Sequence, residues 1–540
     1  MQLSILVIFV TLCASLLTGA WADDDHHGGD DHDCDGDDHH HCDHHHHHHH
    51  HNQSAQATPV HVRTSHGTPY PPSPHKNGPD DESAARPHFP IGKPRGPIHP
   101  SSPGVNLTIM GGSNTTIDIS RVKRQRCVGN GVVFNISTVF GSGGLPTEPS
   151  GAQAGQVIFT TANTFAAISI DGGTTFSTID VTIYAGHANP ATDGGSCCDQ
   201  IVHYLPSIDR FVWLIQYWPN NKSVNKFRLI TFHPRDVDKK GINSWIFLDI
   251  ISTDVKLKGP LDYGDLAVGN NQLYVSATNT GVGLIVIRIP IAALNVVGSL
   301  TYWYTDPNIG SVAYFSHLSQ NPGDTVFWAG HSTIGTTMRI FKWPESGTMY
   351  FWNDIRIHDW PSNSKNFVSP CPGNNKTSWV FGAQFHDIIG VTRRSTNEVW
   401  FSWPAPSGGG FPNLHIQIAQ IDPSKWPTLR LIKQWQIWNP DFAFAYPSLY
   451  TNACGDVGVA VAFGGGQFNP TSAVGIADSN GVVTQTVYYP ELSNVCEDRF
   501  GDYLTVRQGV GMGYTGFVYA EKSTNEGTAR HPRFLEFGRG

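Results

Sequence analysis

Short, strand-like segments separated by turn residues fill the chain from Val132 onward, and this pattern limits the possible fold more than any other feature. Residues 210–217, 284–288 and 398–402 are typical, since they are rich in β-branched and aromatic side chains. Clusters of Gly, Asn, Asp and Pro separate such segments, and no stretch has the period of a long amphipathic helix. The sequence therefore predicts an all-β domain over residues 125–540.

Repetition within this domain narrows the architecture. A domain this long exceeds a single β-sandwich, and loosely similar modules, each a strand pair around a turn, recur along it. They lie near residues 155–183, 200–232, 262–290, 311–343, 378–420, 443–478 and 500–536. We predict a β-propeller with six or seven blades, because radial repetition buries both faces of small sheets. A pair of β-sandwich domains is the alternative.

One motif carries a resemblance to a known family. The stretch Ser169-Ile-Asp171-Gly-Gly173-Thr-Thr175-Phe176 matches the Asp-box of sialidase-like (BNR-repeat) β-propellers. Residues 498–503 and 446–448 also resemble segments of secreted sialidase-like propellers. The resemblance implies a divergent member of that superfamily. In such a motif the aspartate caps a tight turn between outer strands, so the Asp-box is a device of the fold and not of catalysis.

Few residues of the sequence support an enzymatic function. The resemblance implies an arginine triad, a tyrosine nucleophile and an acid/base carboxylate, but arginine and glutamate are sparse and the family's Arg-Ile-Pro motif is missing from the domain start. Similar polar clusters in two modules are the candidate site residues: Asp262, Tyr263, Asp265, Asp498, Arg499, Asp502 and Tyr503. Alternatively, these side chains hydrogen-bond turns within their own blades. Six scattered histidines, among them His317, are expected to be structural.

The N-terminus predicts secretion. Residues 3–17 are an apolar run too short to cross a bilayer, and Ala20 and Ala22 fit a signal-peptidase site. We therefore expect residues 1–22 to be a signal peptide, no membrane span, and an extracellular protein.

Residues 23–124 are expected to be disordered, His/Asp-rich at first and then Pro-rich, because they lack apolar periodicity. Residues 1–124 carry a net charge of −6 out of −9 for the whole chain. Nothing is basic enough to indicate nucleic-acid binding. Arg121-Val-Lys123-Arg124 resembles a furin-type processing site, which would make the preceding region a propeptide and Gln125 the first mature residue; a chance basic cluster is the alternative.

Fourteen histidines, interleaved at first with aspartates, predict binding of divalent transition metals such as zinc or copper. These residues are His26, His27, His32, His39, His40, His41, His44, His45, His46, His47, His48, His49, His50 and His51. Neutral imidazoles are required, so binding would weaken as pH falls through about 6.5. A solvated linker is the alternative, and no cofactor is evident for the propeller.

Modification sites agree with an extracellular address. Glycosylation acceptors of the Asn-x-Ser/Thr type are Asn52, Asn106, Asn114, Asn135, Asn221 and Asn375. Six cysteines of the main domain are compatible with three disulfides in any of fifteen pairings: Cys127, Cys197, Cys198, Cys371, Cys454 and Cys496. Because adjacent cysteines rarely pair, Cys197 and Cys198 are each expected to reach a distant partner. Cys34 and Cys42 lie in the acidic region.

The function that the sequence favours is extracellular recognition of a glycan or protein by the propeller, with a metal-binding N-terminal region. A sialidase-like glycoside hydrolase or lyase is the enzymatic alternative, and convergent carboxylates near the propeller's centre would favour it. An extracellular metal-handling or mineral-matrix protein is the third candidate.

Overall fold

The structure is a computed structural model that describes residues 53–71, 89–109, 127, 132–142, 147–256, 259–279, 282–381, 385–477, 486–524 and 527–539. The predicted signal peptide, histidine-rich region and processing site lie outside these residues. Within them, no helix is long and apolar enough to cross a membrane.

Antiparallel sheets built from consecutive strands make up the fold, which is the all-β propeller that the strand pattern predicted. The first sheet contains β6 (Ser150–Ala154), β7 (Val157–Ala162), β8 (Phe165–Ser169) and β9 (Ser177–Ile179). The second contains β10 (Ile201–Leu205), β11 (Arg210–Gln216), β12 (Lys226–Phe232) and β15 (Ile246–Ile251). The third contains β16 (Leu261–Val268), β17 (Gln272–Asn279), β18 (Gly283–Pro290) and β19 (Ser299–Tyr304).

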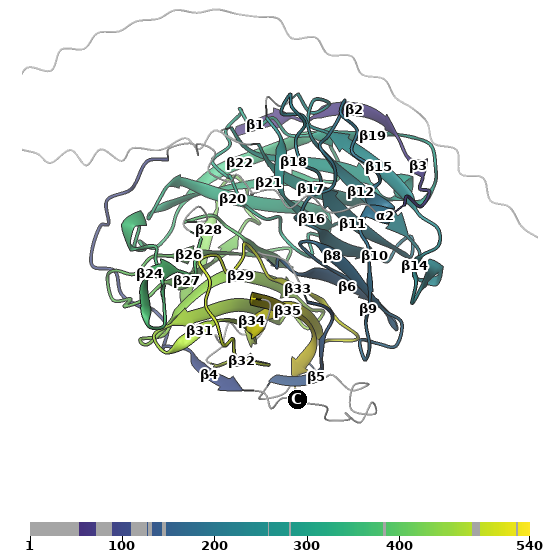
Figure 1. Ribbon diagram of the computed structural model, residues 1–540. Coiled ribbons are helices and arrows are strands. Elements are labelled where there is room, and N and C mark those ends of the chain that lie inside the picture. The colour runs from purple at the N-terminus through teal and green to yellow at the C-terminus, as the bar shows by residue number, and fades with distance from the viewer. Residues whose placement is uncertain are drawn as a thin grey trace, which may run out of the picture. The chain divides into compact units, whose positions relative to one another are not determined.

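Two further sheets continue this pattern. One contains β20 (Thr325–Thr333), β21 (Thr337–Pro344) and β22 (Met349–Arg356). The next contains β25 (Gly390–Ser395), β26 (Glu398–Ala405), β27 (His415–Asp422) and β28 (Arg430–Ile437). Figure 1 shows the sheets arranged around a centre, with β6, β16, β29 and β33 nearer to it than β3, β4 and β14.

A nine-stranded sheet completes the ring. It contains β29 (Ala443–Thr451), β30 (Val457–Gly465), β31 (Phe468–Ala477), β32 (Thr486–Tyr489), β33 (Thr505–Gln508), β34 (Tyr514–Thr524), β35 (Gly527–Arg539), β4 (Asn106–Ile109) and β5 (Val132–Val139). Its two meanders, β29-β30-β31 and β33-β34-β35, are joined by the single pair Thr471–Ala520. Strand β5 pairs with β35, so the start of the domain closes on its end.

The predicted count of six or seven separate blades is therefore wrong, since five sheets of four or five strands are separate. Module counting treated residues 443–478 and 500–536 as independent blades. The contact between β31 and β34 merges them into one sheet, and spacing along the sequence does not reveal such a contact.

The remaining described elements are short. Strands β13 (Val237–Asp238) and β14 (Gly241–Ile242) form one small hairpin, and β23 (Pro370–Cys371) with β24 (Asn374–Ser378) forms another. The helix α2 (Thr182–Ala185) has a single turn, and 3-10 turns occur at Pro234–Asp236, Ile291–Asn295 and Ser364–Asn366.

The expected disorder of residues 23–124 does not extend over the whole region. Strands β1 (Gln53–Gln56), β2 (Thr58–Arg63) and β3 (Ser65–His66) pair with the outer strands of three sheets, and β4 pairs with β32. Edge pairing uses backbone hydrogen bonds, which need no apolar periodicity in the added strand. The remainder of the region lies outside the described residues.

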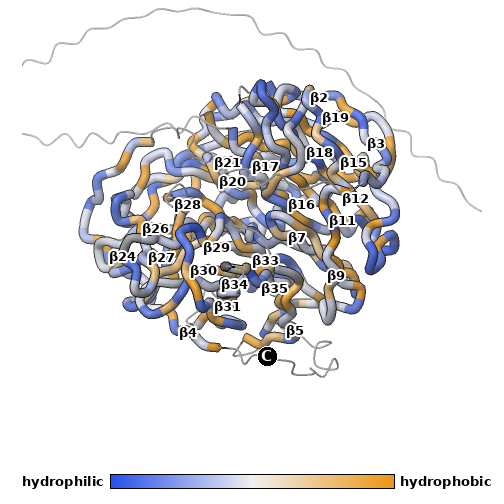
Figure 2. The backbone as a smooth tube through the Cα atoms, in the orientation of Figure 1, coloured by the Kyte–Doolittle hydropathy of each residue, from blue (hydrophilic) through white to orange (hydrophobic). Residues whose placement is uncertain are grey.

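Apolar side chains from all of these sheets meet between the blades. One hydrophobic cluster takes Leu214 from β11, Ile287 from β18, Ile340 from β21 and Phe401 from β26. Figure 2 shows hydrophobic stretches along the strands and many hydrophilic loops at the periphery. Tryptophan contributes to this interior, and no tryptophan of the described ranges belongs to the exposed large hydrophobic residues.

The three predicted disulfides are present, and their pairing is Cys127–Cys454, Cys371–Cys496 and Cys197–Cys198. The expectation that the adjacent pair reaches distant partners is wrong. Both side chains are buried, with exposed fractions of 8% and 6%, and the other four cysteines are paired among themselves.

The glycosylation acceptors differ in accessibility. Asn106 and Asn221 are exposed, whereas Asn135 is buried in β5 with an exposed fraction of 8%. Asn52 and Asn114 lie outside the described residues, and the side chain of Asn375 is not among those described. Among the three acceptors whose side chains the structure describes, Asn106 and Asn221 are therefore the accessible ones.

Candidate functional site

Five residues within or just before the inner strands share an uncommon backbone conformation. Glu148, Asp199, Tyr263, His386 and Tyr446 have φ angles of 45°, 40°, 50°, 66° and 53°. Side chains other than glycine rarely adopt positive φ, and residues held in such conformations cluster at binding and catalytic sites. We therefore assign the candidate functional site to the centre of the propeller.

Four carboxylates from different parts of the ring meet there. Glu148 precedes β6, Asp199 precedes β10, Asp262 lies in β16 and Asp502 precedes β33. Glu148 and Asp502 are fully buried. Arg499 faces this group and pairs with Asp502 through an Nη2–Oδ2 contact of 2.5 Å. We refer to these five residues as the acidic centre.

Burial and mutual repulsion change the protonation of the acidic centre. Burial raises the pKa of Glu148 well above its usual range, and the charges of Asp199 and Asp502 act in the same direction. Burial likewise raises the pKa of Asp262, with Asp502 adding to the shift. Arg499 opposes both shifts, so the centre combines carboxyl groups of raised pKa with a fixed cation.

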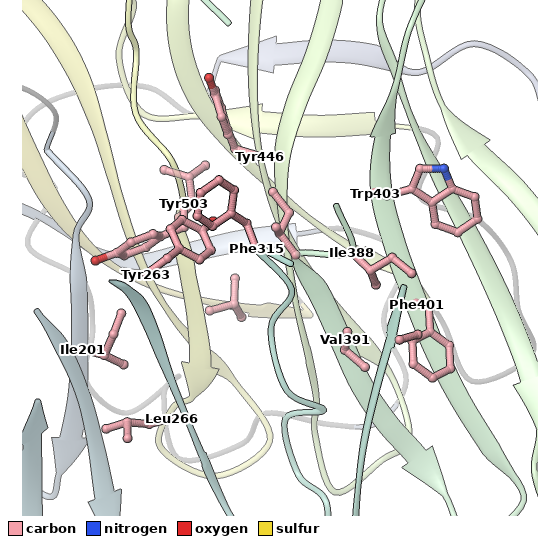
Figure 3. Packing of buried hydrophobic residues seen from close by; sticks show 14 of the residues in the cluster. Ile201, Tyr263, Leu266, Phe315, Ile388, Val391, Phe401, Trp403, Tyr446 and Tyr503 are labelled. Atoms are coloured by element: carbon pink, nitrogen blue, oxygen red, sulfur yellow. The ribbon is translucent and has the colours of Figure 1, made fainter. Parts of the chain in front are cut away.

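Aromatic rings form the floor beneath the carboxylates. The ring of Tyr263 lies 6.0 Å from that of Tyr503, 5.2 Å from that of His317 and 5.0 Å from that of Phe315, measured between centroids. Figure 3 shows Tyr263, Phe315 and Tyr503 gathered in this way. The Tyr263 hydroxyl donates to the backbone oxygen of Asp502 over 3.2 Å. The tyrosines thus connect β16 to the segment before β33.

Several buried polar groups of this cluster have no hydrogen-bond partner within the described part of the chain. Among them are the Tyr503 hydroxyl, Oδ1 of Asp502 and both carboxyl oxygens of Glu148. Burial raises the pKa of Tyr503 well above its usual range, with Asp199 and Glu148 adding to the shift, so the hydroxyl keeps its proton. Buried polar groups of native proteins normally have partners, and a water or ligand atom would supply one here.

A small cavity adjoins these aromatic rings. Its lining includes Asp265, Gln320 and Arg507 together with Tyr503 and His317. Asp265 accepts a hydrogen bond from the backbone N–H of Leu318 over 2.9 Å, which ties β16 to the next sheet. Burial lowers the pKa of Arg507, and the Asp265 charge opposes that shift. Asp265 therefore lines the cavity and also has a structural partner in the segment before β20.

The adjacent disulfide borders the acidic centre. Cys198 directly precedes Asp199, and Gln216 of β11 donates from Nε2 to Cys198 Sγ at 3.7 Å and to Asp262 Oδ1 at 2.7 Å. The Asp199 backbone N–H donates to Asn163 Oδ1 over 2.9 Å. Gln216 and the disulfide thus hold two of the carboxylates in position.

The structure brings together five of the seven predicted polar residues: Asp262, Tyr263, Arg499, Asp502 and Tyr503. Asp265 lies on the cavity wall, and Asp498 is exposed. Their contacts cross between sheets, as the Gln216–Asp262 and Tyr263–Asp502 hydrogen bonds show, so they do more than close turns within single blades.

Sequence reasoning missed Glu148, Asp199 and Gln216, and it expected His317 to be structural. One signal could have found Glu148, because Glu148-Pro-Ser before β6 repeats the pattern of Tyr446-Pro-Ser in β29. The Ser150 and Ser448 hydroxyls of these motifs both accept a backbone N–H from a neighbouring inner strand, at 3.0 and 3.1 Å.

The Asp-box lies between β8 and β9, away from the acidic centre. Asp171 accepts hydrogen bonds from the Thr175 backbone N–H at 2.9 Å, the Thr175 hydroxyl at 2.6 Å and the Ser169 hydroxyl at 2.8 Å. Gly172 and Gly173 have φ angles of 72° and 89°. Phe176 packs against Phe534, with ring centroids 5.9 Å apart.

Metal ligation finds no support in the described ranges, where no group of three or more His, Cys, Asp or Glu side chains is arranged to hold an ion. The predicted histidine ligands lie outside those ranges.

Comparisons with known proteins give only distant structural similarities and no family. No family model and no curated protein matches the chain. Among solved structures, an α-L-arabinanase of Penicillium chrysogenum complexed with arabinobiose is 10% identical with a TM-score of 0.36, over 76% of this chain and 99% of that one. AofleA of Arthrobotrys oligospora is 11% identical (TM-score 0.32; 67% and 90%). Trypanosoma rangeli sialidase in complex with sialic acid is 11% identical (TM-score 0.33; 63% and 54%).

Proposed function

We propose that the protein acts on an extracellular glycan, as a hydrolase or lyase that uses the acidic centre for acid–base chemistry. The observation that supports this is the convergence of Glu148, Asp199, Asp262 and Asp502 around Arg499. Pairs of carboxyl groups whose environments separate their pKa values are the usual basis of general acid and general base roles.

Each residue type suits a role. Glu148 keeps its proton because of burial and of Asp199, so it is the proposed proton donor. Asp262 is half-buried and accepts hydrogen bonds from the Gln216 side chain and from the backbone N–H of Tyr263, so it is the proposed base. Arg499 stacks on Phe381 at 4.7 Å, and its partly exposed side chain can receive an oxygen of the substrate.

A recognition role without turnover is the second candidate. The observation that favours it is the complete burial of Glu148 and Asp502, since a substrate must reach a proton donor to receive its proton. In that case the acidic centre organises the ring, and the ligand binds only to partly exposed groups such as Asp262 and Arg499.

The test is an activity screen with a paired variant. The purified protein is incubated with neutral and acidic polysaccharides, and new reducing ends and unsaturated products are measured. Glu148→Gln should lower the rate by about 10²- to 10⁴-fold, the usual contribution of a general acid. Glu536→Gln is the matched control, because Glu536 is also buried with a pKa raised by burial but lies on β35 outside the centre.

Two results would contradict this proposal. Equal rates for both variants would remove Glu148 from the chemistry. Binding of a glycan without any product, unchanged in Glu148→Gln, would establish the recognition role instead.

A further inference from the structure

The N-terminal residues 53–71 and 89–109, here termed the strap, follow the outer edge of the propeller. Strand β1 adds to β22, β2 to β19 and β3 to β15. After the intervening segment, which is outside the described residues, the strap forms a bridge from Ile91 to Ile334 and ends as β4 beside β32. Figure 1 shows β1, β2 and β3 in purple along one side of the rim and β4 on the other.

Backbone pairing is the first source of attachment. Six consecutive residues of β2 pair with β19, from Thr58–Tyr304 to Arg63–Ser299, and four residues of β1 pair with β22. The added strands occupy sheet edges, whose N–H and C=O groups otherwise face solvent. This is the geometry in which a peptide binds a protein by strand addition.

Buried side chains anchor the strap between those pairings. Ala57 is 3% exposed within one hydrophobic cluster, and Val105 is 0% exposed within another that includes Trp435. The Thr64 hydroxyl donates to the Val296 backbone oxygen over 2.8 Å. The strap therefore contributes side chains to the hydrophobic clusters as well as strands to the sheet edges.

Close backbone approach adds a third kind of contact. Gly67 lies against Trp245 so tightly that a Cβ atom would be 1.6 Å from the indole nitrogen. Its N–H donates to the Trp245 backbone oxygen over 3.0 Å. Near the other end, the Ser102 hydroxyl donates to the Gln436 backbone oxygen over 2.8 Å.

The rest of the propeller is complete without the strap. The ring closes through β5 and β35, which both follow the strap in sequence. All three disulfides connect residues from Cys127 onward, so none of them links the strap to the ring. After a cut between residues 110 and 126, only non-covalent contacts would hold strap and ring together.

We propose that the strap is a docked ligand of the propeller rim that stays bound after such a cut. Processing at Arg121–Arg124 then yields a two-chain particle instead of releasing a propeptide. Several attachment points on separate sheets must open together for the strap to leave, which makes dissociation slow. The histidine-rich segment, which ends at His51 just before β1 in the sequence, then stays attached to the mature protein.

The test uses the full chain with a site for a sequence-specific protease placed in residues 113–118. The protein is cut, passed through native size-exclusion chromatography and identified by intact mass. The proposal predicts that both fragments elute together and separate only in denaturant. Elution of the N-terminal fragment on its own from the cut, folded protein would overturn it.

Paired variants show whether the observed contacts are responsible. Val105→Asp places a charge at a fully buried position, whereas Ile109→Asp places the same charge on β4 at a position that is 56% exposed. Fragment loss after cutting should become at least about tenfold faster in the first variant and stay unchanged in the second. Equal loss in both would contradict docking through these contacts. The cut parent protein decides the question even if Val105→Asp fails to fold.

Discussion

The Asp-box turn and the segments before the inner strands both contain a positive φ angle beside a carboxylate, but they accommodate these features differently. At the Asp-box, Gly172 and Gly173 supply the positive φ angles, and Asp171 accepts three hydrogen bonds from Ser169 and Thr175. At the centre, Glu148 and Asp199 themselves adopt positive φ, and the carboxyl groups face one another. The outer turn is locally satisfied and stabilises the fold, whereas the inner positions are strained and depend on the surrounding ring. That contrast is the reason for assigning function to the centre.

The largest expected effect separates the two regions by activity. Glu148→Gln should reduce turnover by about 10²- to 10⁴-fold, because the proton donor is lost. Asp171→Ala, in the Asp-box, should leave turnover per folded molecule unchanged. Steady-state rates on the substrate found by the screen measure both, and an equal loss in the two variants would end the distinction.

Stability should respond in the reverse order. Asp171→Ala removes the acceptor of three hydrogen bonds, and we expect it to lower the free energy of unfolding by about 1–3 kcal/mol. Glu148→Gln removes a carboxyl group whose ionised form is unfavourable, so stability should stay equal or rise. Denaturant unfolding checks this, and a strongly destabilised Glu148→Gln protein would contradict the account of the centre.

The pH dependence of stability should also differ. The pKa of Glu148 is raised in the folded protein, so its favourable contribution is complete below the unfolded value of about 4.3 and is lost as pH rises through the folded pKa. Relative to Glu148→Gln, the parent protein should therefore lose stability above about pH 4.3. The loss should reach about 1.4 kcal/mol for each unit that separates the two pKa values. Parallel pH profiles of the two melting temperatures would refute the raised pKa.

The smallest predicted change is a shift in the pH–rate profile. Asp199→Asn removes a negative charge that raises the pKa of Glu148. The limb of the profile that requires protonated Glu148 should move to lower pH, while asparagine still tolerates positive φ. A shift to higher pH would mean that Asp199 acts on Glu148 in some other way.

The fold was predictable to the extent that it depends on local pattern. Strand periodicity identified the all-β domain, and the Asp-box motif identified the turn between β8 and β9. The pairing of Thr471 with Ala520 joins two predicted modules into one sheet, and neither segment has a sequence pattern that indicates this pairing. The strap was missed because strand pairing at an edge depends on backbone groups, which composition does not report.

The site was predictable only in part for the same reason. Asp262, Tyr263 and Asp502 stood out as clustered polar residues within single modules. Glu148 and Asp199 are isolated in sequence, and the closure of the ring alone brings them to the others. The Cys197–Cys198 disulfide was not predictable either, because adjacent cysteines rarely pair. The other four cysteines pair with one another across long stretches of the chain, which leaves these two without a distant partner.

The most direct test of the central claim is the protonation of Glu148, measured by infrared difference spectroscopy between the parent protein and Glu148→Gln across a pH series. The account predicts a protonated carboxyl band that persists well above the usual pKa of glutamate and is absent from Glu148→Gln. A Glu148 carboxyl that ionises in its ordinary range would contradict the account, because the centre would then hold no proton for Glu148 to donate.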